Sequence, residues 1–325
     1  MKKKLIATAM VILGLITTIG CSTKENNNQS GKLRVAVTIN PLREFTEIIG
    51  GDKVEVFSII PNGADVHDAE PMPKSLEKLN NSDIFVYNGL NMEEWIDKIL
   101  GTIKNKDIEI VNSSNGVNVI ELSEEDHSNE AEDEHKDHDE DEHHDEDEHG
   151  HEGHDHGAQD PHVWLSLKEA TKQAENIKNA LVLKDEVNKD YYEENFEKLK
   201  KEFSDIYEEY VEKFKTVTNR EFFTGHAAFG YLCRDFGLNQ NSIADIYAEG
   251  ELTPKSLENL ANYAKENNVK TVFSESASSS SEAETLAREA GAKVEKIYSL
   301  ESKEDELSYL EGIKYNYETI YQALK

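Results

Sequence analysis

The feature that most constrains this fold is the segment 185–217, which contains neither glycine nor proline. Its apolar and aromatic residues recur three to five positions apart, as on one face of a helix. These residues are Tyr191, Phe196, Leu199, Phe203, Ile206, Tyr210 and Phe214. About 30 residues at 1.5 Å each make a helix roughly 45 Å long, enough to run the height of two domains. We therefore predict one long helix that links two domains.

The sequence on both sides of this segment alternates short apolar runs with helical patterns, which predicts parallel sheets covered on both faces. The expected strands are 33–39, 54–60, 84–87, 108–111, 221–224, 242–247, 271–274 and 294–298. Helices are expected near 167–183, 226–236, 254–267, 279–290 and 305–324. We predict an α/β fold of two lobes, each a mainly parallel sheet flanked by helices. The lobes should span 32–184 and 218–325, joined by the long helix 185–217.

An extremely acidic stretch interrupts the first lobe. Residues 121–157 hold nineteen Asp or Glu and one Lys, and so contribute −18 to the formal net charge of −31. Within 123–158 no apolar side chain is larger than alanine, so this part cannot bury a core and should be a disordered insert. A surface this acidic repels nucleic acid, which excludes DNA and RNA as partners.

The first residues read as a secretory signal peptide over 1–20. Three lysines precede an apolar run of about 15 residues, and the small Gly20 stands directly before Cys21. The junction resembles a bacterial lipobox, in which the cysteine is acylated and becomes the new N-terminus. We predict a lipid anchor at Cys21 and a flexible polar tether over 21–31. Cys233 would then be a lone thiol.

Nine of the twelve histidines lie in the acidic insert. They are His127, His135, His138, His143, His144, His149, His151, His154 and His156. Interleaved with Asp and Glu, they offer auxiliary weak metal sites for capture, buffering or sensing. Because imidazole must be neutral to bind a metal, such a role should weaken below about pH 6.

The three remaining histidines lie in loops that contain glycine or proline. The segments are Gly-Ala-Asp-Val-His67-Asp-Ala-Glu-Pro, Asp-Pro-His162-Val-Trp and Thr-Gly-His226-Ala-Ala-Phe-Gly-Tyr. α/β folds place ligand groups in such loops, at the carboxyl ends of strands. Three imidazoles from separate loops suit Zn²⁺ or a neighbouring first-row metal. We therefore predict that these histidines share one metal site.

These three motifs, together with the acidic His-rich loop, resemble the high-affinity zinc-binding lipoproteins of bacterial ABC importers, the ZnuA/AdcA type. The resemblance runs from Leu33 to the C-terminal helix. It implies a metal cleft between two α/β lobes joined by a long rigid helix. It also implies a function outside the cytoplasm: a lipid-anchored monomer that binds one Zn²⁺ tightly and delivers it to a membrane permease.

By position, the resemblance implies that His67 and His162 come from the first lobe and His226 from the second. The family's fourth ligand is a carboxylate, water or another group in a late loop of the second lobe. Glu301 is the best match here and Glu275 the runner-up. Three imidazoles and one carboxylate favour Zn²⁺, because Mn²⁺ prefers more oxygen ligands.

Two other functions remain open. One is a manganese-binding or adhesin-like relative of the same fold. The other is a zinc hydrolase, because three protein ligands and a water also make a catalytic site. The sequence has no His-Glu-x-x-His motif, and Glu301 in the fourth position would leave no reactive water. We therefore expect a binding protein and no enzyme.

Overall fold

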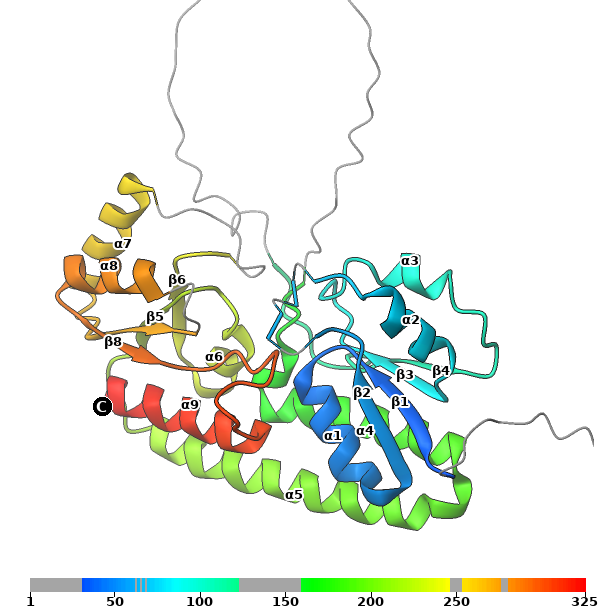
Figure 1. Ribbon diagram of the computed structural model, residues 1–325. Coiled ribbons are helices and arrows are strands. Elements are labelled where there is room, and N and C mark those ends of the chain that lie inside the picture. The colour runs from blue at the N-terminus through cyan, green and yellow to red at the C-terminus, as the bar shows by residue number, and fades with distance from the viewer. Residues whose placement is uncertain are drawn as a thin grey trace, which may run out of the picture. The chain divides into compact units, whose positions relative to one another are not determined.

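The computed structural model describes residues 31–61, 63–64, 66–67, 69–122, 159–245, 253–275 and 280–325 (Figure 1). Residues Lys32–Lys325 form one compact unit. The predicted signal peptide, Cys21 and the insert 123–158 with its nine histidines lie outside the described residues. Among the helices that are described, none is both long enough and apolar enough to cross a membrane.

Strands and helices alternate along most of the chain. The strands are β1 (Leu33–Val37), β2 (Val54–Ser58), β3 (Ile84–Tyr87), β4 (Glu109–Asn112), β5 (Glu221–Thr224), β6 (Asn239–Ser242), β7 (Thr271–Ser274) and β8 (Lys293–Lys296). The α-helices are α1 (Asn40–Gly50), α2 (Pro73–Asn80), α3 (Ile96–Leu100), α4 (Leu167–Lys184), α5 (Lys189–Phe214), α6 (Gly230–Phe236), α7 (Pro254–Glu266), α8 (Ser280–Ala290) and α9 (Tyr309–Leu324). Short 3₁₀ turns are η1 (Gly51–Lys53), η3 (Val163–Leu165) and η4 (Glu186–Asn188).

The strands form two four-stranded sheets with the orders β2-β1-β3-β4 and β6-β5-β7-β8. Every pairing in both sheets is parallel. We call the part built on the first sheet the N-terminal lobe and the part built on the second the C-terminal lobe. The predicted fold class is confirmed: two α/β lobes with parallel sheets, linked by a long helix. The two sheets also share one strand order, so the lobes repeat the same topology.

One predicted strand was wrong. The sequence placed it at 242–247, whereas β6 is Asn239–Ser242 and pairs with β5. Its four residues, Asn-Gln-Asn-Ser, are all polar, so the apolar pattern did not reveal them. β6 lies at the edge of its sheet and keeps its side chains half-buried or exposed, and an edge strand therefore needs no apolar run.

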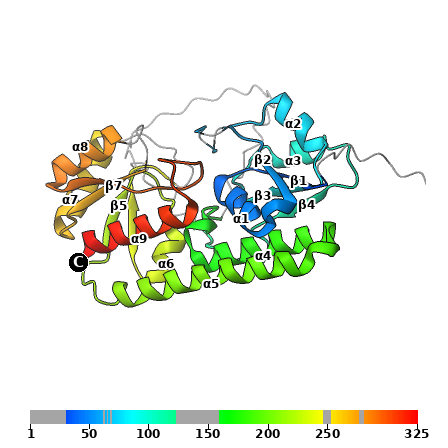
Figure 2. The ribbon, with the colours of Figure 1, turned by 60° about the horizontal axis from the view of Figure 1, so that its bottom comes forward.

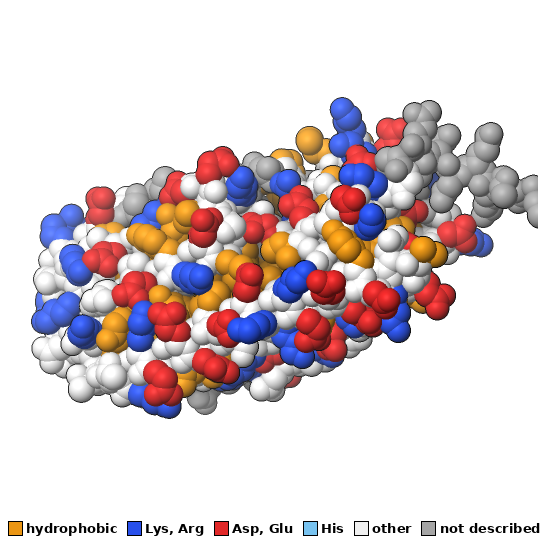
Figure 3. Space-filling view, turned by 90° about the horizontal axis from the view of Figure 1, so that it is seen from below, with side chains coloured by type: hydrophobic (Ala, Val, Ile, Leu, Met, Phe, Trp, Pro, Cys, Tyr) orange, Lys and Arg blue, Asp and Glu red, His pale blue; other side chains and the backbone are white. Residues whose placement is uncertain are grey.

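Helix α5 runs beneath both sheets, as Figures 1 and 2 show. Its buried face differs from the prediction in one residue, because Tyr192 is buried and Tyr191 is exposed. Tyr192 lies four positions before Phe196 and so fits the helical spacing better. The outer face of α5 carries Lys–Glu and Lys–Asp pairs one turn apart, and the space-filling view of this side shows both charges interspersed (Figure 3).

The apolar core is continuous across the lobes. One large cluster includes the interior of the N-terminal sheet, α4, α5, α6 and α9. A second, smaller cluster lies between the C-terminal sheet and the pair α7 and α8. In β5, Phe222 faces the large cluster and Phe223 the small one, since successive strand residues point to opposite faces. The same large apolar core thus supports the loops at the carboxyl ends of both sheets.

Candidate metal centre

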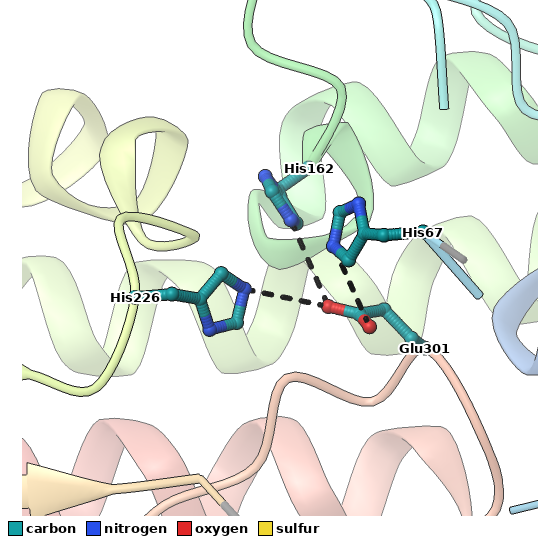
Figure 4. Close-up of side chains that lie close together, drawn as sticks. All are labelled: His67, His162, His226 and Glu301. Atoms are coloured by element: carbon teal, nitrogen blue, oxygen red, sulfur yellow. Dashed lines mark ion pairs between the residues drawn. The ribbon is translucent and has the colours of Figure 1, made fainter. Parts of the chain in front are cut away.

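Four side chains from both lobes converge on one point (Figure 4). His67 lies in the loop after β2, and His162 directly precedes η3. His226 follows β5, and Glu301 lies in the loop between β8 and α9. Each lobe therefore supplies two of the four groups, from loops that follow its parallel strands. The structure brings together the three histidines and the carboxylate that the sequence singled out.

The Nε2 atoms of the three histidines face the carboxylate of Glu301. The distances from Nε2 to the nearest carboxylate oxygen are 3.8 Å for His67, 3.7 Å for His162 and 3.6 Å for His226. The imidazole centroids stand 5.3 to 5.9 Å apart. One ligand atom from each of the four residues lies within 4.8 Å of all the others.

This spacing fits a shared cation better than direct contacts. Hydrogen bonds of this kind measure about 2.7–3.2 Å, so all three separations are too long. Two ligand atoms of a tetrahedral zinc, each about 2 Å from the ion, lie about 3.3 Å from each other. The three distances between Nε2 and the Glu301 oxygens differ from this value by about half an ångström or less. Nε2 of His162 and Oε1 of Glu301 are also buried without a hydrogen-bond partner among the described residues. Such atoms suit metal coordination.

The charge state of Glu301 also suits a cation. Burial by itself raises the pKa of this carboxyl group. The interaction with the His226 imidazole and the charges of His67 and His162 outweigh burial and lower the pKa to about 2. Glu301 is therefore an anion at neutral pH, with its charge directed at the point where the three Nε2 atoms meet.

A buried carboxylate orients His162 from behind. Oδ1 of Asp160 lies 2.9 Å from Nδ1 of His162 and accepts the main-chain N–H of His162 at 2.9 Å. Asp160 is held in turn from the C-terminal lobe, because the hydroxyl of Tyr231 donates to its carbonyl oxygen at 2.7 Å. Asp160 and Tyr231 lie within the sequence motifs of His162 and His226, but no pattern in the sequence indicates a role for either.

Glu275, the runner-up fourth ligand, lies on the other side of His226. Its Oε1 is 4.0 Å from Nδ1, whereas Glu301 faces Nε2 of the same ring. Both carboxylate oxygens of Glu275 accept the N–H of Gly225, at 3.1 and 3.0 Å. Burial raises the pKa of this carboxyl group above its usual value. Glu275 thus contacts the histidine loop and is not one of the four converging groups.

The loop that carries Glu301 is anchored on both sides. Trp164 donates its indole N–H to the carbonyl of Ser299 at 2.7 Å, and the carbonyl of Glu301 accepts the N–H of Asn40 at 2.8 Å. Leu300 has φ +64, a left-handed conformation that is unusual outside glycine. Its side chain packs over Gly312 of α9, where a Cβ atom would collide with it. These contacts hold the strained turn that directs the carboxylate inward.

The fold and this site together define a class: a two-lobed α/β binding protein with a candidate cation site between its lobes. A family model described as "ZnuA: Zinc-uptake complex component A periplasmic" matches residues 35–323. The chain therefore belongs to the ZnuA family, which comprises substrate-binding proteins of metal ABC transporters.

Three similar proteins illustrate the range of this family. The high-affinity zinc uptake system protein ZnuA of Bacillus subtilis (strain 168) is 39% identical over 309 residues, covering 93% of this chain and 91% of the relative. The manganese ABC transporter substrate-binding lipoprotein PsaA of Streptococcus anginosus is 28% identical and covers 99% of both chains. A solved structure, the Zn(II)-bound ZnuA-like domain of Streptococcus pneumoniae AdcA, superposes with a TM-score of 0.72 at 27% identity, covering 90% of this chain and 99% of that one.

Proposed function

We propose that this protein captures Zn²⁺ outside the cytoplasmic membrane and delivers it to the permease of an ABC importer. His67, His162, His226 and Glu301 would be the ligands of a single tight site. The observation that carries this proposal is the convergence of three Nε2 atoms on the carboxylate of Glu301, whose side chain is only 11% exposed. Zinc is the cargo of this site.

The donor set supports zinc over manganese. Imidazole nitrogen is a good ligand for Zn²⁺, which accepts four-coordinate geometry without electronic preference. Mn²⁺ favours sites richer in oxygen, and only one of the four groups here is a carboxylate. The zinc-named relative is also more similar to this chain than the manganese-named one, at 39% against 28% identity.

Manganese transport is the second candidate, because a manganese-named relative aligns over 99% of this chain. Catalysis is not proposed. With Glu301 as the fourth ligand, no coordination position is left for a reactive water.

Anchoring at the membrane would keep the captured ion close to the permease. We propose that Cys21 is the acylated N-terminus, on the basis of the signal-peptide pattern before it. The variant Cys21→Ser should leave the membrane fraction. Membrane association equal to that of the unchanged protein would contradict the anchor.

The nine histidines of the insert would supply additional weak sites. Deleting residues 123–158 should remove weak zinc equivalents in isothermal titration and leave one tight site and the melting temperature nearly unchanged. Loss of the tight site on deletion would show that a histidine of the insert belongs to it.

A metal competition experiment tests the central proposal. The purified protein, stripped of metal, is titrated with Zn²⁺ and Mn²⁺ against a chelator of known affinity, and anomalous scattering from crystals of the loaded protein identifies ion and ligands together. We expect Zn²⁺ to bind far more tightly and to contact all four residues. Tighter binding of Mn²⁺ would favour the second candidate.

A further inference from the structure

Two buried carboxylates stand behind two of the imidazoles, one in each lobe. Asp160 and Glu275 are 2% and 5% exposed, and neither belongs to the four converging groups. Both face Nδ1, the ring nitrogen turned away from Glu301. The separations are 2.9 Å for Asp160 to His162 and 4.0 Å for Glu275 to His226.

The contacts of Asp160 determine which nitrogen of His162 carries the proton. Oδ1 of Asp160 already accepts the main-chain N–H of His162, so it acts as an acceptor toward the ring as well. The proton between them therefore belongs to Nδ1, so in the neutral ring Nε2 carries the lone pair that can bind a metal. A neutral imidazole in water favours the opposite form, with the proton on Nε2, which cannot bind a metal through that atom.

The C-terminal lobe supports Asp160 in this position. A Cβ atom at Gly230 would lie 2.6 Å from Oδ2 of Asp160, so the carboxylate fits only because this residue is glycine. The neighbouring Tyr231 holds the carbonyl of Asp160. Both residues begin α6, directly after the loop of His226. The orientation of a histidine in one lobe thus depends on a helix of the other.

Glu275 has an analogous but looser relation to His226. It is fixed by the N–H of Gly225, the residue before the histidine. The carbonyl of His226 is held separately, by the Thr224 hydroxyl at 2.6 Å and the Gln240 amide at 2.8 Å. The backbone of this loop is therefore fixed, with a carboxylate on the Nδ1 side of the ring.

We propose that Asp160 is a positioning residue that selects the Nδ1–H form of His162, so that this ring offers Nε2 to the metal, while Glu275 supports the loop that carries His226. This inference rests on the proposed metal-binding function. Outer carboxylates that accept the second N–H of a ligating histidine fix its ring and make it a stronger ligand. Glu275 should have the smaller effect, because its 4.0 Å separation from Nδ1 of His226 is too long for a hydrogen bond.

The test reads the proton position in the metal-free protein. The full chain is labelled with ¹⁵N-histidine, and long-range ¹H–¹⁵N spectra report which ring nitrogen is protonated. His162 should show the Nδ1–H form in the unchanged protein and a mixture of forms in Asp160→Ala. Asp160→Asn, whose amide oxygen still accepts a hydrogen bond, should retain the Nδ1–H form.

Zinc affinity, measured by chelator competition, provides the second readout. Asp160→Ala should weaken binding by about 10 to 100-fold, Asp160→Asn by less, and Glu275→Ala by only several-fold. Asp235→Asn is the matched control, because its side chain is equally buried and accepts from Ser166 but lies behind no imidazole. It should change neither the proton position nor the affinity.

Two results would overturn the inference: an Nδ1–H form that persists in Asp160→Ala, or a control variant with the same losses as Asp160→Ala. The spectra require no metal. If the protein instead proved to bind manganese, the proposed function would fail while the proton position at His162 could still be read.

Discussion

The two lobes share a strand order but differ in what supports them. Both faces of the N-terminal sheet belong to the large core, which includes Phe85 and Val86 of β3. In the C-terminal sheet, only the face that carries Phe222 and Phe273 belongs to the large core, and we call it the inner face. The outer face rests on a cluster of eight buried residues, of which four are alanines.

This difference shows which parts of the fold the metal site needs. Both ligand loops of the C-terminal lobe pack against the large core. Phe229, three residues after His226, and Leu300, directly before Glu301, are buried in it. Among the described residues, the buried apolar side chains of α7 and α8 all belong to the small cluster. These two helices cover the outer face of the C-terminal sheet and contribute none of the four ligand groups. Substitutions in this outer layer should therefore affect metal binding less than substitutions in the inner layer.

The largest expected effect comes from truncating one core residue in each layer. Phe85→Ala should cost about 3–5 kcal/mol and lower the stability of the whole unit. Leu286→Ala, in the small cluster, should cost about 2–5 kcal/mol but act locally. Hydrogen exchange should then accelerate in α7 and α8, while zinc affinity stays within twofold. A large loss of zinc affinity in Leu286→Ala would mean that the outer layer also supports the site.

The second comparison is between the ligands of the two lobes. Losing an outer partner of a ligand costs about 10 to 100-fold in affinity, so losing the ligand itself should cost more. His67→Ala, His162→Ala and His226→Ala should each weaken zinc binding by more than about 100-fold. Glu301→Ala should cost less, and Glu275→Ala least. Chelator competition ranks them, and a greater loss for Glu275→Ala than for Glu301→Ala would reverse our assignment of the fourth ligand.

The sequence predicted the repeated α/β layout because apolar strands and helical spacing leave a strong pattern. It missed β6, whose four polar residues carry no such signal. It also chose Tyr191 where Tyr192 is buried, because one aromatic residue follows the other and the helix continues through both. The spacing of apolar residues locates most helices and strands. It does not locate an edge strand such as β6, which forms because it pairs with the neighbouring strand β5.

The candidate site was predictable in part. His67, His162 and His226 stood out because every other histidine lies in the acidic insert. Only the family resemblance ranked Glu301 above Glu275, since both residues follow strands of the C-terminal lobe. The left-handed turn at Leu300 and its packing over Gly312 direct Glu301 inward. The residues around Leu300 contain no sequence signal that predicts such a turn. The roles of Asp160 and Gly230 depend on a contact between lobes, which spacing along the chain does not reveal.

A smaller effect separates two glutamates, Glu93, which is buried, and Glu304, which is half-buried. Burial raises the pKa of Glu93 in the N-terminal lobe, where it accepts hydrogen bonds from Thr38, Asn88 and Gly89. Burial chiefly raises the pKa of Glu304 in the C-terminal lobe to about 7, and the charges of Glu301 and Asp305 add to this.

A carboxyl group whose pKa is raised on folding holds its proton longer in the folded state, so stability falls as pH rises from about 4.5 to 7. Glu304→Gln should therefore stabilise the metal-free protein by about 1–2 kcal/mol at pH 8 and by almost nothing at pH 4. Glu93→Gln should destabilise it at both values, because an amide cannot accept all three hydrogen bonds. Urea unfolding at the two pH values measures both. A pH-independent effect of Glu304→Gln would contradict the raised pKa.

The smallest effect compares an ion pair between the lobes with one on the surface of α5. Lys168 of α4 pairs with Asp235 of α6 at 3.0 Å, and Lys201 pairs with Asp205 within α5 at 2.6 Å. The lysines are 50% and 73% exposed, so solvent screens both pairs, although Asp235 itself is almost fully buried. Lys168→Met should cost about 1 kcal/mol in urea unfolding, and Lys201→Met should change the stability less, because solvent screens its pair more strongly. Because Lys168 also lies over the ring of Tyr207, at 4.4 Å from its centroid, the neutral Met retains part of that packing and isolates the charge. Equal losses for the two variants would show that the contact between the lobes adds nothing beyond an ordinary surface pair.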